Sequence, residues 1–203
     1  MSARVLLARH GQTEWHAENR YAGSSEVGLT AEGLRQAEAL GRYAAEVKPA
    51  ALFCSPQDRA RRTIAPAAEA LGLVPEIVGD LRETHFGIAE GRTRDEVRAG
   101  NPGVVEQFLA DPVAGSFPGA ENPLAAAERG ARAVREIARR GHGLALVVAH
   151  NTLLRLTFCH LLGIPLATYR TVFPQLGNAA VTELEITGDR TALLRFNLPL
   201  GTR

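Results

Sequence analysis

Two histidines in this chain follow short apolar runs and stand beside residues suited to binding an anion. Arg9-His10-Gly11 comes directly after Val5-Leu6-Leu7-Ala8, and His150-Asn151 comes directly after the apolar run 144–149. In an α/β protein, side chains at the carboxyl ends of parallel strands point into a shared crevice. We therefore expect His10 and His150 to lie close together in the folded chain. Two facing imidazoles beside arginines favour phosphoryl chemistry.

Two arginines are placed to hold a phosphate near these histidines. A phosphate monoester carries about two negative charges near neutral pH, and a planar guanidinium binds two of its oxygens at once. Arg9 and Arg59 each lie just beyond a predicted strand. Arg59 also falls in the first turn of a predicted helix, whose free amides favour an anion. His10 is then the natural nucleophile, and His150 is placed to donate hydrogen bonds to the phosphoryl oxygens.

Glu83, in Leu81-Arg82-Glu83, is the candidate general acid. The alkoxide that leaves a sugar or glycerol phosphate is strongly basic, and general acid catalysis contributes about 10²–10⁴-fold. A neighbouring phosphate dianion favours the protonated carboxyl group. We expect neither a metal nor another cofactor, because the arginines and histidines supply the positive charge and the chain lacks the clustered carboxylates of a two-metal site.

The elements that must position these residues alternate in type. Apolar residues recur at helical spacing over 34–47, 60–71, 124–137 and 152–162. Thr30 is a plausible cap for the first of these helices, and Ser55-Pro56 opens the second. Short strands are predicted at 5–8, 50–54, 75–78 and 144–149, with a hairpin over 180–196. This order predicts a three-layer α/β/α sandwich with a mainly parallel sheet and a C-terminal antiparallel hairpin.

Length and composition indicate one domain over residues 1–203. The chain is 45% hydrophobic and 22% charged, which is ordinary for a globular protein of this length. Residues 92–123 are rich in proline and glycine. We expect them to be an irregular segment, with one short helix around 104–109, that covers the site.

Charge and hydropathy exclude several function classes. The net charge of +1 provides no field that would attract nucleic acid or a membrane surface. Arg4, Arg9 and His10 interrupt any signal peptide, and no apolar run reaches transmembrane length. Cys54 and Cys159 show neither redox nor zinc spacing. We therefore expect a cytoplasmic protein without a nucleic-acid or membrane partner. The terminal hairpin offers an edge strand, which leaves a homodimer open.

Four segments together resemble the histidine phosphatase superfamily, which includes the cofactor-dependent phosphoglycerate mutases. They are Arg9-His10-Gly11, Ser55-Pro56-Gln57-Asp58-Arg59-Ala60, Leu81-Arg82-Glu83 with Gly87 and Glu90-Gly91, and Ala149-His150-Asn151. The resemblance covers nearly the whole chain. It implies that His10 carries the phosphoryl group while the two arginines and His150 bind it. It also implies that Glu83 gives the proton and then activates water.

Four further residues are expected to contact substrate: Gly11, His16, Arg20 and Asn151. His16 stands where the family usually has an asparagine that touches phosphate. Ala89 replaces a usual tryptophan, and Asn151 stands where glycine is common. These departures leave the four segments intact and concern the shape of the substrate pocket.

These features predict a phosphomonoesterase of the histidine acid phosphatase type. It would hydrolyse a small phosphorylated metabolite through a phosphohistidine on His10. A phosphoglycerate mutase-type isomerase is one alternative, but mutases usually carry a longer, lysine-containing insertion after the acid segment, and this region is short and lacks lysine here. A non-catalytic binder of phosphorylated ligands is the other alternative. It has no need of the nucleophile and the acid, and the chain has both.

Overall fold

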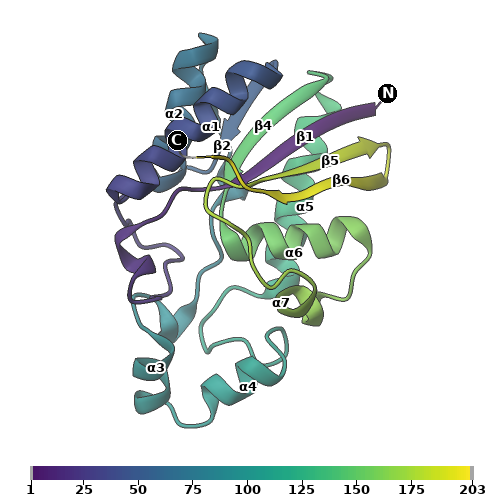
Figure 1. Ribbon diagram of the computed structural model, residues 1–203. Helices are drawn as coiled ribbons and strands as arrows, with labels where there is room; N and C mark the ends of the chain where they lie inside the picture. Colours follow the sequence, from purple (N-terminus) through teal and green to yellow (C-terminus); the bar gives the residue numbers. More distant parts are fainter. Residues whose placement is uncertain (1, 202–203) are drawn as a thin grey trace.

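A six-stranded mixed sheet organises the chain in the computed structural model, which describes residues 2–201 (Figure 1). The strands are β1 (Ser2–Arg9), β2 (Ala51–Cys54), β3 (Glu76–Ile77), β4 (Leu144–Ala149), β5 (Val181–Thr187) and β6 (Arg190–Leu198). Their order is β3-β2-β4-β1-β5-β6, with β1 to β4 parallel and β5 antiparallel to both β1 and β6. The prediction of a mainly parallel sheet with an antiparallel C-terminal hairpin is confirmed.

Helices cover both faces of this sheet (Figure 1). They are α1 (Ala31–Val47), α2 (Asp58–Leu71), α3 (Arg94–Gly100), α4 (Val104–Ala110), α5 (Pro123–Arg139), α6 (Asn151–Leu162) and α7 (Tyr169–Val172). Short 3₁₀ turns occur at Glu14–His16, Gly79–Leu81, Gly87–Ala89 and Leu166–Thr168. Alternate residues of β1 point to opposite faces: Leu6 packs with the α1–α2 side, and Leu7 packs with the α5–α6 side. The three-layer arrangement is therefore confirmed.

Local signals set most helix boundaries. The Thr30 side chain accepts a hydrogen bond from the Gly33 amide, so the predicted cap is confirmed. Helix α2 begins at Asp58 rather than at Ser55-Pro56. The difference arises because Ser55 continues the extended course of β2, and its amide donates to the Val148 carbonyl at 3.0 Å. Arg59 still falls in the first turn of α2, as predicted.

Segment 92–123 is more regular than its composition indicates. It contains α4 as predicted, together with the unpredicted helix α3. A capping box between Thr93 and Glu96 starts α3, and this Thr-x-x-Glu signal is visible in the sequence. The two helices lie at one end of the molecule (Figure 1) and enclose a small apolar cluster that includes Phe108 and Phe117.

Within residues 2–201, every helix is too short or too polar to cross a lipid bilayer. Edge strand β6 exposes apolar side chains at Leu193, Leu194 and Phe196. The homodimer stays a prediction, as does the assignment of the whole chain to one domain.

Candidate active site

The register of β1 and β4 brings the two histidines together. Arg9 is the register partner of Ala149, so the next residue along each strand, His10 and His150, leaves the same edge of the sheet. Their ring centroids are 5.1 Å apart, and both side chains are buried. The expectation that the two imidazoles become neighbours is confirmed.

His10 is held in one tautomer. Its Nδ1 lies 2.7 Å from the Gly11 carbonyl oxygen, so this nitrogen carries the proton and donates it. Burial, followed by the positive charges of Arg9 and Arg59, lowers the pKa of His10 well below its usual value. The ring is therefore neutral near pH 7, and the lone pair of Nε2 is free. A neutral imidazole in this state is a nucleophile.

Gly11 allows this close geometry. A Cβ atom at Gly11 would lie 2.5 Å from the Gly33 carbonyl oxygen in α1. The Gly11 amide also donates to Thr63 Oγ1 at 2.9 Å. The residue therefore fixes the turn after β1, and its carbonyl orients His10.

His150 is held between an arginine and a serine. Arg59 Nε donates to His150 Nδ1 at 3.3 Å, and His150 Nε2 lies 2.7 Å from Ser55 Oγ. Because Nδ1 accepts, the proton of the neutral ring is on Nε2 and faces Ser55. Burial and the charge of Arg59 lower the pKa of His150 well below its usual value. Ser55 lies within a motif segment, but its residue type and position alone indicate no role.

Arg9 reaches into the space beside His10. Its Nη1 donates to the Leu176 carbonyl at 2.9 Å, and its Nη2 lies 2.5 Å from His16 Nε2. The buried Nε atom has no hydrogen-bond partner within the described part of the chain. Burial lowers the pKa of Arg9 to about 10, and Arg155 contributes to this shift, so the guanidinium stays charged at neutral pH.

Most N–H donors of the Arg59 guanidinium already bind groups within the protein. Arg59 is fully buried, and its terminal nitrogens donate to the carbonyls of Ser25 (2.7 Å), Ala22 (3.0 Å) and Gly23 (2.9 Å). Arg59 therefore ties loop 22–25 to His150 and adds positive charge behind the two imidazoles.

Glu83 is anchored at the N-terminus of α6. Its Oε1 accepts from the amides of Thr84 and Leu153, both at 2.9 Å, and its Oε2 accepts from the amide of Thr152 at 3.0 Å. The amides of Thr152 and Leu153 lie in the first turn of α6, so this carboxyl group is fixed in position at the start of the helix. Oε2 accepts one bond and retains one lone pair for a proton.

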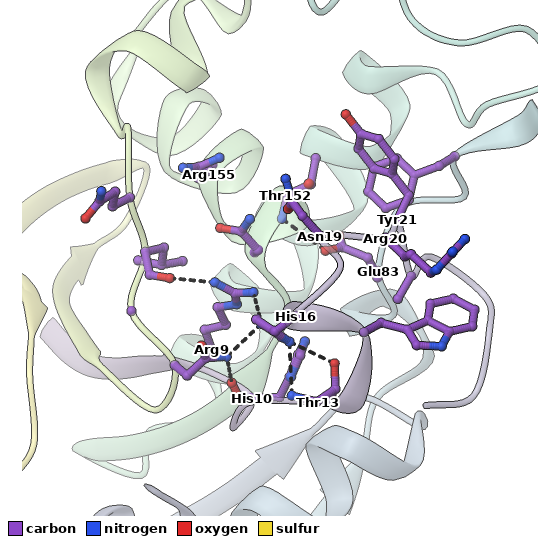
Figure 2. A pocket seen from close by; sticks show the side chains of 18 of the residues that line it. Arg9, His10, Thr13, His16, Asn19, Arg20, Tyr21, Glu83, Thr152 and Arg155 are labelled. Atoms are coloured by element: carbon purple, nitrogen blue, oxygen red, sulfur yellow. Dashed lines mark hydrogen bonds between the residues drawn. The ribbon is translucent and has the colours of Figure 1, made fainter. Parts of the chain in front are cut away.

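A cavity of about 460 Å³ opens in front of these groups (Figure 2). Six residues predicted for the site line it: Arg9, His10, His16, Arg20, Glu83 and Asn151. The remaining predicted residues, Gly11, Arg59 and His150, are absent from its wall. Lining residues that the sequence analysis missed include Trp15, Tyr21, Thr152, Arg155, Arg170 and Asn178. Tyr21 and Asn178 lie in loops, and Arg155 and Arg170 lie on helices, outside the four motif segments.

His16 lies where the family usually has asparagine, and it is neutral. The Thr13 amide donates to His16 Nδ1 at 3.0 Å, and the Arg9 guanidinium lies beside Nε2. Burial, followed by the charge of Arg9, lowers the pKa of His16 to about 4. Asn178 Nδ2 lies 3.2 Å from His16 Nε2 and donates to the His10 carbonyl at 2.9 Å. Donors from several parts of the chain thus converge beside His10.

Arg20 is at the cavity wall, but acidic side chains already hold it. Its Nη1 and Nη2 donate to the two carboxylate oxygens of Glu96 at 2.6 and 2.9 Å, and its Nε donates to Glu18 at 2.6 Å. Among residues 2–201, no group of three or more histidine, cysteine, aspartate or glutamate side chains is arranged to hold a metal ion.

The site consists of two facing neutral histidines with buried arginines beside them, at the edge of a mainly parallel sheet. This arrangement suits the binding of a phosphoryl group. Comparison with known proteins agrees with this class. The profile of the histidine phosphatase superfamily (branch 1) matches residues 5–199, and the chain belongs to this superfamily.

Relatives cover nearly the whole chain. "Putative phosphoserine phosphatase 2" of Hydrogenobacter thermophilus is 29% identical over 201 residues, which is 98% of each chain. "Probable phosphoglycerate mutase GpmB" of Salmonella paratyphi C is 29% identical over 182 residues, covering 89% of this chain and 84% of the relative. The structure of mycobacterial glucosyl-3-phosphoglycerate phosphatase superposes with a TM-score of 0.87 at 27% identity, covering 98% of this chain and 100% of that chain. The superfamily and these neighbours indicate a phosphatase or mutase enzyme.

Proposed function

We propose that this protein hydrolyses small phosphate monoesters through a phosphohistidine formed on Nε2 of His10. The observation that carries the proposal is the state of His10. Its Nδ1 proton is held by the Gly11 carbonyl, its pKa is lowered, and its ring stands 5.1 Å from that of His150. The Nε2 lone pair is therefore available at neutral pH, beside positive charge that stabilises an approaching phosphate.

In the first step the lone pair of His10 Nε2 attacks phosphorus, and the bond between phosphorus and the ester oxygen breaks. The phosphoryl group is then bonded to His10. Arg9 supplies donors to the non-bridging oxygens through its Nε and its terminal nitrogens, since Nε has no partner in the protein. The positive charge of Arg59 acts on His10 and His150 from within the protein core.

Glu83 moves the proton in both half-reactions. In the first half, a proton on Oε2 passes to the leaving alkoxide. In the second half, the carboxylate takes a proton from water, the water oxygen attacks phosphorus, and the bond to His10 breaks. Inorganic phosphate leaves, and both side chains return to their starting states. The Thr152 amide, which donates to Oε2 at 3.0 Å, holds that oxygen in place.

His150 needs a proton on Nδ1 to donate to a phosphoryl oxygen. In the structure this proton is on Nε2, because Arg59 donates to Nδ1. The hydroxyl of Ser55 both accepts from an imidazole N–H and donates to a bare nitrogen. Rotation of this hydroxyl therefore supports either state of Nε2. A proton on Nδ1 also requires Arg59 Nε to release this nitrogen, since two N–H groups cannot donate to each other. In the proposed reaction, bound substrate replaces the Arg59 contact and accepts a hydrogen bond from Nδ1.

His10→Ala tests the nucleophile. We expect it to abolish both phosphate release and the acid-labile, base-stable phosphoenzyme trapped by rapid quench with a radiolabelled substrate. The matched control is His142→Ala, because His142 is exposed and lies outside the cavity. Turnover or a phosphoenzyme in the His10→Ala variant would refute the assignment.

The mutase alternative has its own readout. A phosphoglycerate mutase interconverts 3- and 2-phosphoglycerate and retains the phosphoryl group, whereas a phosphatase releases inorganic phosphate. Both products are measured in one reaction by coupled assays. Interconversion faster than phosphate release would replace the hydrolase by the isomerase. Absence of both, and of any turnover of p-nitrophenyl phosphate, would favour the non-catalytic binder.

A further inference from the structure

The cavity wall carries more positive charge than one phosphate requires. Besides Arg9 and the already paired Arg20, the wall includes Arg94, Arg155 and Arg170. The acidic side chains on the wall are limited to one, Glu83.

Arg155 is the most constrained of these arginines. It is 5% exposed and lies on α6, one helical turn after Asn151. One terminal nitrogen donates to the Pro174 carbonyl, while the buried Nε has no partner within residues 2–201. Burial, followed by the charge of Arg170, lowers the pKa of Arg155. A buried guanidinium without a counter-ion is costly, which indicates a missing anionic partner.

Arg170 extends the same charged surface. It stacks over the Phe108 ring at 5.2 Å, which orients it from the α4 side. The electrostatic influence of both Arg170 and Arg94 reaches Tyr21, so these side chains surround one part of the cavity. No ion pair within 4.0 Å joins Arg94, Arg155 or Arg170 to a carboxylate in the described range 2–201.

Glu83 offsets this positive charge only in part. Its charge raises the pKa of Arg155, but burial and the charge of Arg170 outweigh it, and the net shift is downward. Its oxygens also accept hydrogen bonds from backbone amides at the start of α6 rather than from these arginines. The remaining positive charge is available to an anionic ligand.

We propose that Arg155 and Arg170, with Arg94 beside them, bind a second anionic group of the substrate, a carboxylate or a second phosphate. The preferred substrates are then small phosphate monoesters with another acidic group. The inference rests on the proposed function in one respect, that the scissile phosphate occupies the end of the cavity at Arg9 and His10.

The second subsite lies close to the first. Figure 2 shows Arg9 between His10 and Arg155, and the charge of Arg155 acts on Arg9. Both arginines line the same cavity of about 460 Å³, which favours a small molecule that carries both anionic groups.

A matched pair of compounds tests the inference. 3-Phosphoglycerate and glycerol 3-phosphate have the same three-carbon length, but the second lacks the carboxylate. We expect the wild-type kcat/KM to be about 10- to 100-fold higher for 3-phosphoglycerate, as for a hydrogen bond to a charged group. Glycerol 1,3-bisphosphate is compared with glycerol 3-phosphate in the same way. If its kcat/KM exceeds that of 3-phosphoglycerate, the subsite prefers a phosphate; if it is lower, the subsite prefers a carboxylate.

Substitution locates the subsite. Arg155→Met should remove most of this preference, measured as the ratio of kcat/KM for 3-phosphoglycerate to that for glycerol 3-phosphate, whereas Arg155→Lys should restore part of it. Arg170→Met, at a less buried position, provides the same readout if Arg155→Met does not fold. Arg61→Met is the control, because Arg61 is exposed on α2 away from the cavity.

Equilibrium binding of the same compounds to the His10→Gln variant separates the two proposals. A preference in binding without turnover by the wild type would overturn the hydrolase and retain the second subsite. Turnover by the wild type without any preference for the second acidic group would overturn the subsite and retain the hydrolase. A preference that survives in both Arg155→Met and Arg170→Met would also overturn it.

Discussion

Replacing Glu83 by glutamine separates the chemical role of this side chain from its structural one. The substitution keeps the shape but removes the ability to donate a proton to the leaving alkoxide. We expect kcat for glycerol 3-phosphate to fall by about 10²–10⁴-fold, the usual contribution of general acid catalysis. p-Nitrophenyl phosphate should lose far less, since its leaving phenolate is stable without a proton.

The contacts of Glu83 set the structural cost. All three of its backbone partners are donors, at 2.9, 2.9 and 3.0 Å. The amide nitrogen of glutamine is also a donor, so one backbone N–H loses its acceptor. With the nitrogen placed towards Thr152, which is only partly buried, we expect a loss of about 1 kcal/mol in unfolding free energy, the low end for an unsatisfied donor.

The assay compares both substrates in the wild type and in Glu83→Gln, with urea denaturation of each. Glu121→Gln is a suitable control, because this carboxylate pairs with Arg129 and does not line the cavity in front of His10. Equal losses on the two substrates would refute the general acid role. If Glu83→Gln lowers the unfolding free energy but leaves kcat for glycerol 3-phosphate unchanged, Glu83 serves only to cap the start of α6.

Three further results are expected. Ser55→Ala deprives His150 Nε2 of its partner at 2.7 Å, so kcat should fall about tenfold while KM changes little; an unchanged kcat would exclude the tautomer role. Because burial lowers the pKa of His16 from 6.5 to about 4, the unfolded state takes up protons in this range, and urea denaturation should show the unfolding free energy falling as pH drops from about 6.5 towards 4. His16→Asn should show a smaller decline, and an identical decline would refute the shift. Gly11→Ala brings a Cβ to 2.5 Å from the Gly33 carbonyl, and calorimetry should show a loss of about 1–3 kcal/mol; no loss would contradict the close packing of this turn.

The arrangement of the layers could be predicted because local physical signals agree with one another. The apolar runs at β1 and β4 have the length of buried strands, and each ends at a histidine. Thr30 caps α1, and the alternating pattern near the C-terminus predicts the hairpin. Errors arose where a local signal competed with the sheet, as at Ser55, which pairs with β4 instead of starting α2.

The charge environment of the site could not be predicted in the same way. Arg155 lies on an apolar helix and Arg170 on a short later helix, and nothing in their spacing indicates that they line the same cavity as Arg9. Arg59 was expected to bind phosphate, yet its terminal nitrogens bind the carbonyls of loop 22–25. Such contacts join segments far apart along the chain.

The sequence by itself determined the strands, the helices, the family resemblance and the pair of histidines at neighbouring strand ends, because these follow from local patterns and from the parallel order of the elements. Only the tertiary structure decided which nitrogen of His10 and of His150 carries the proton, which amides hold Glu83 and which arginines lack a counter-ion. The physical reason is that tautomers, hydrogen bonds and buried charge depend on distances of a few ångströms. The groups that come so close are often about a hundred residues apart or more along the chain.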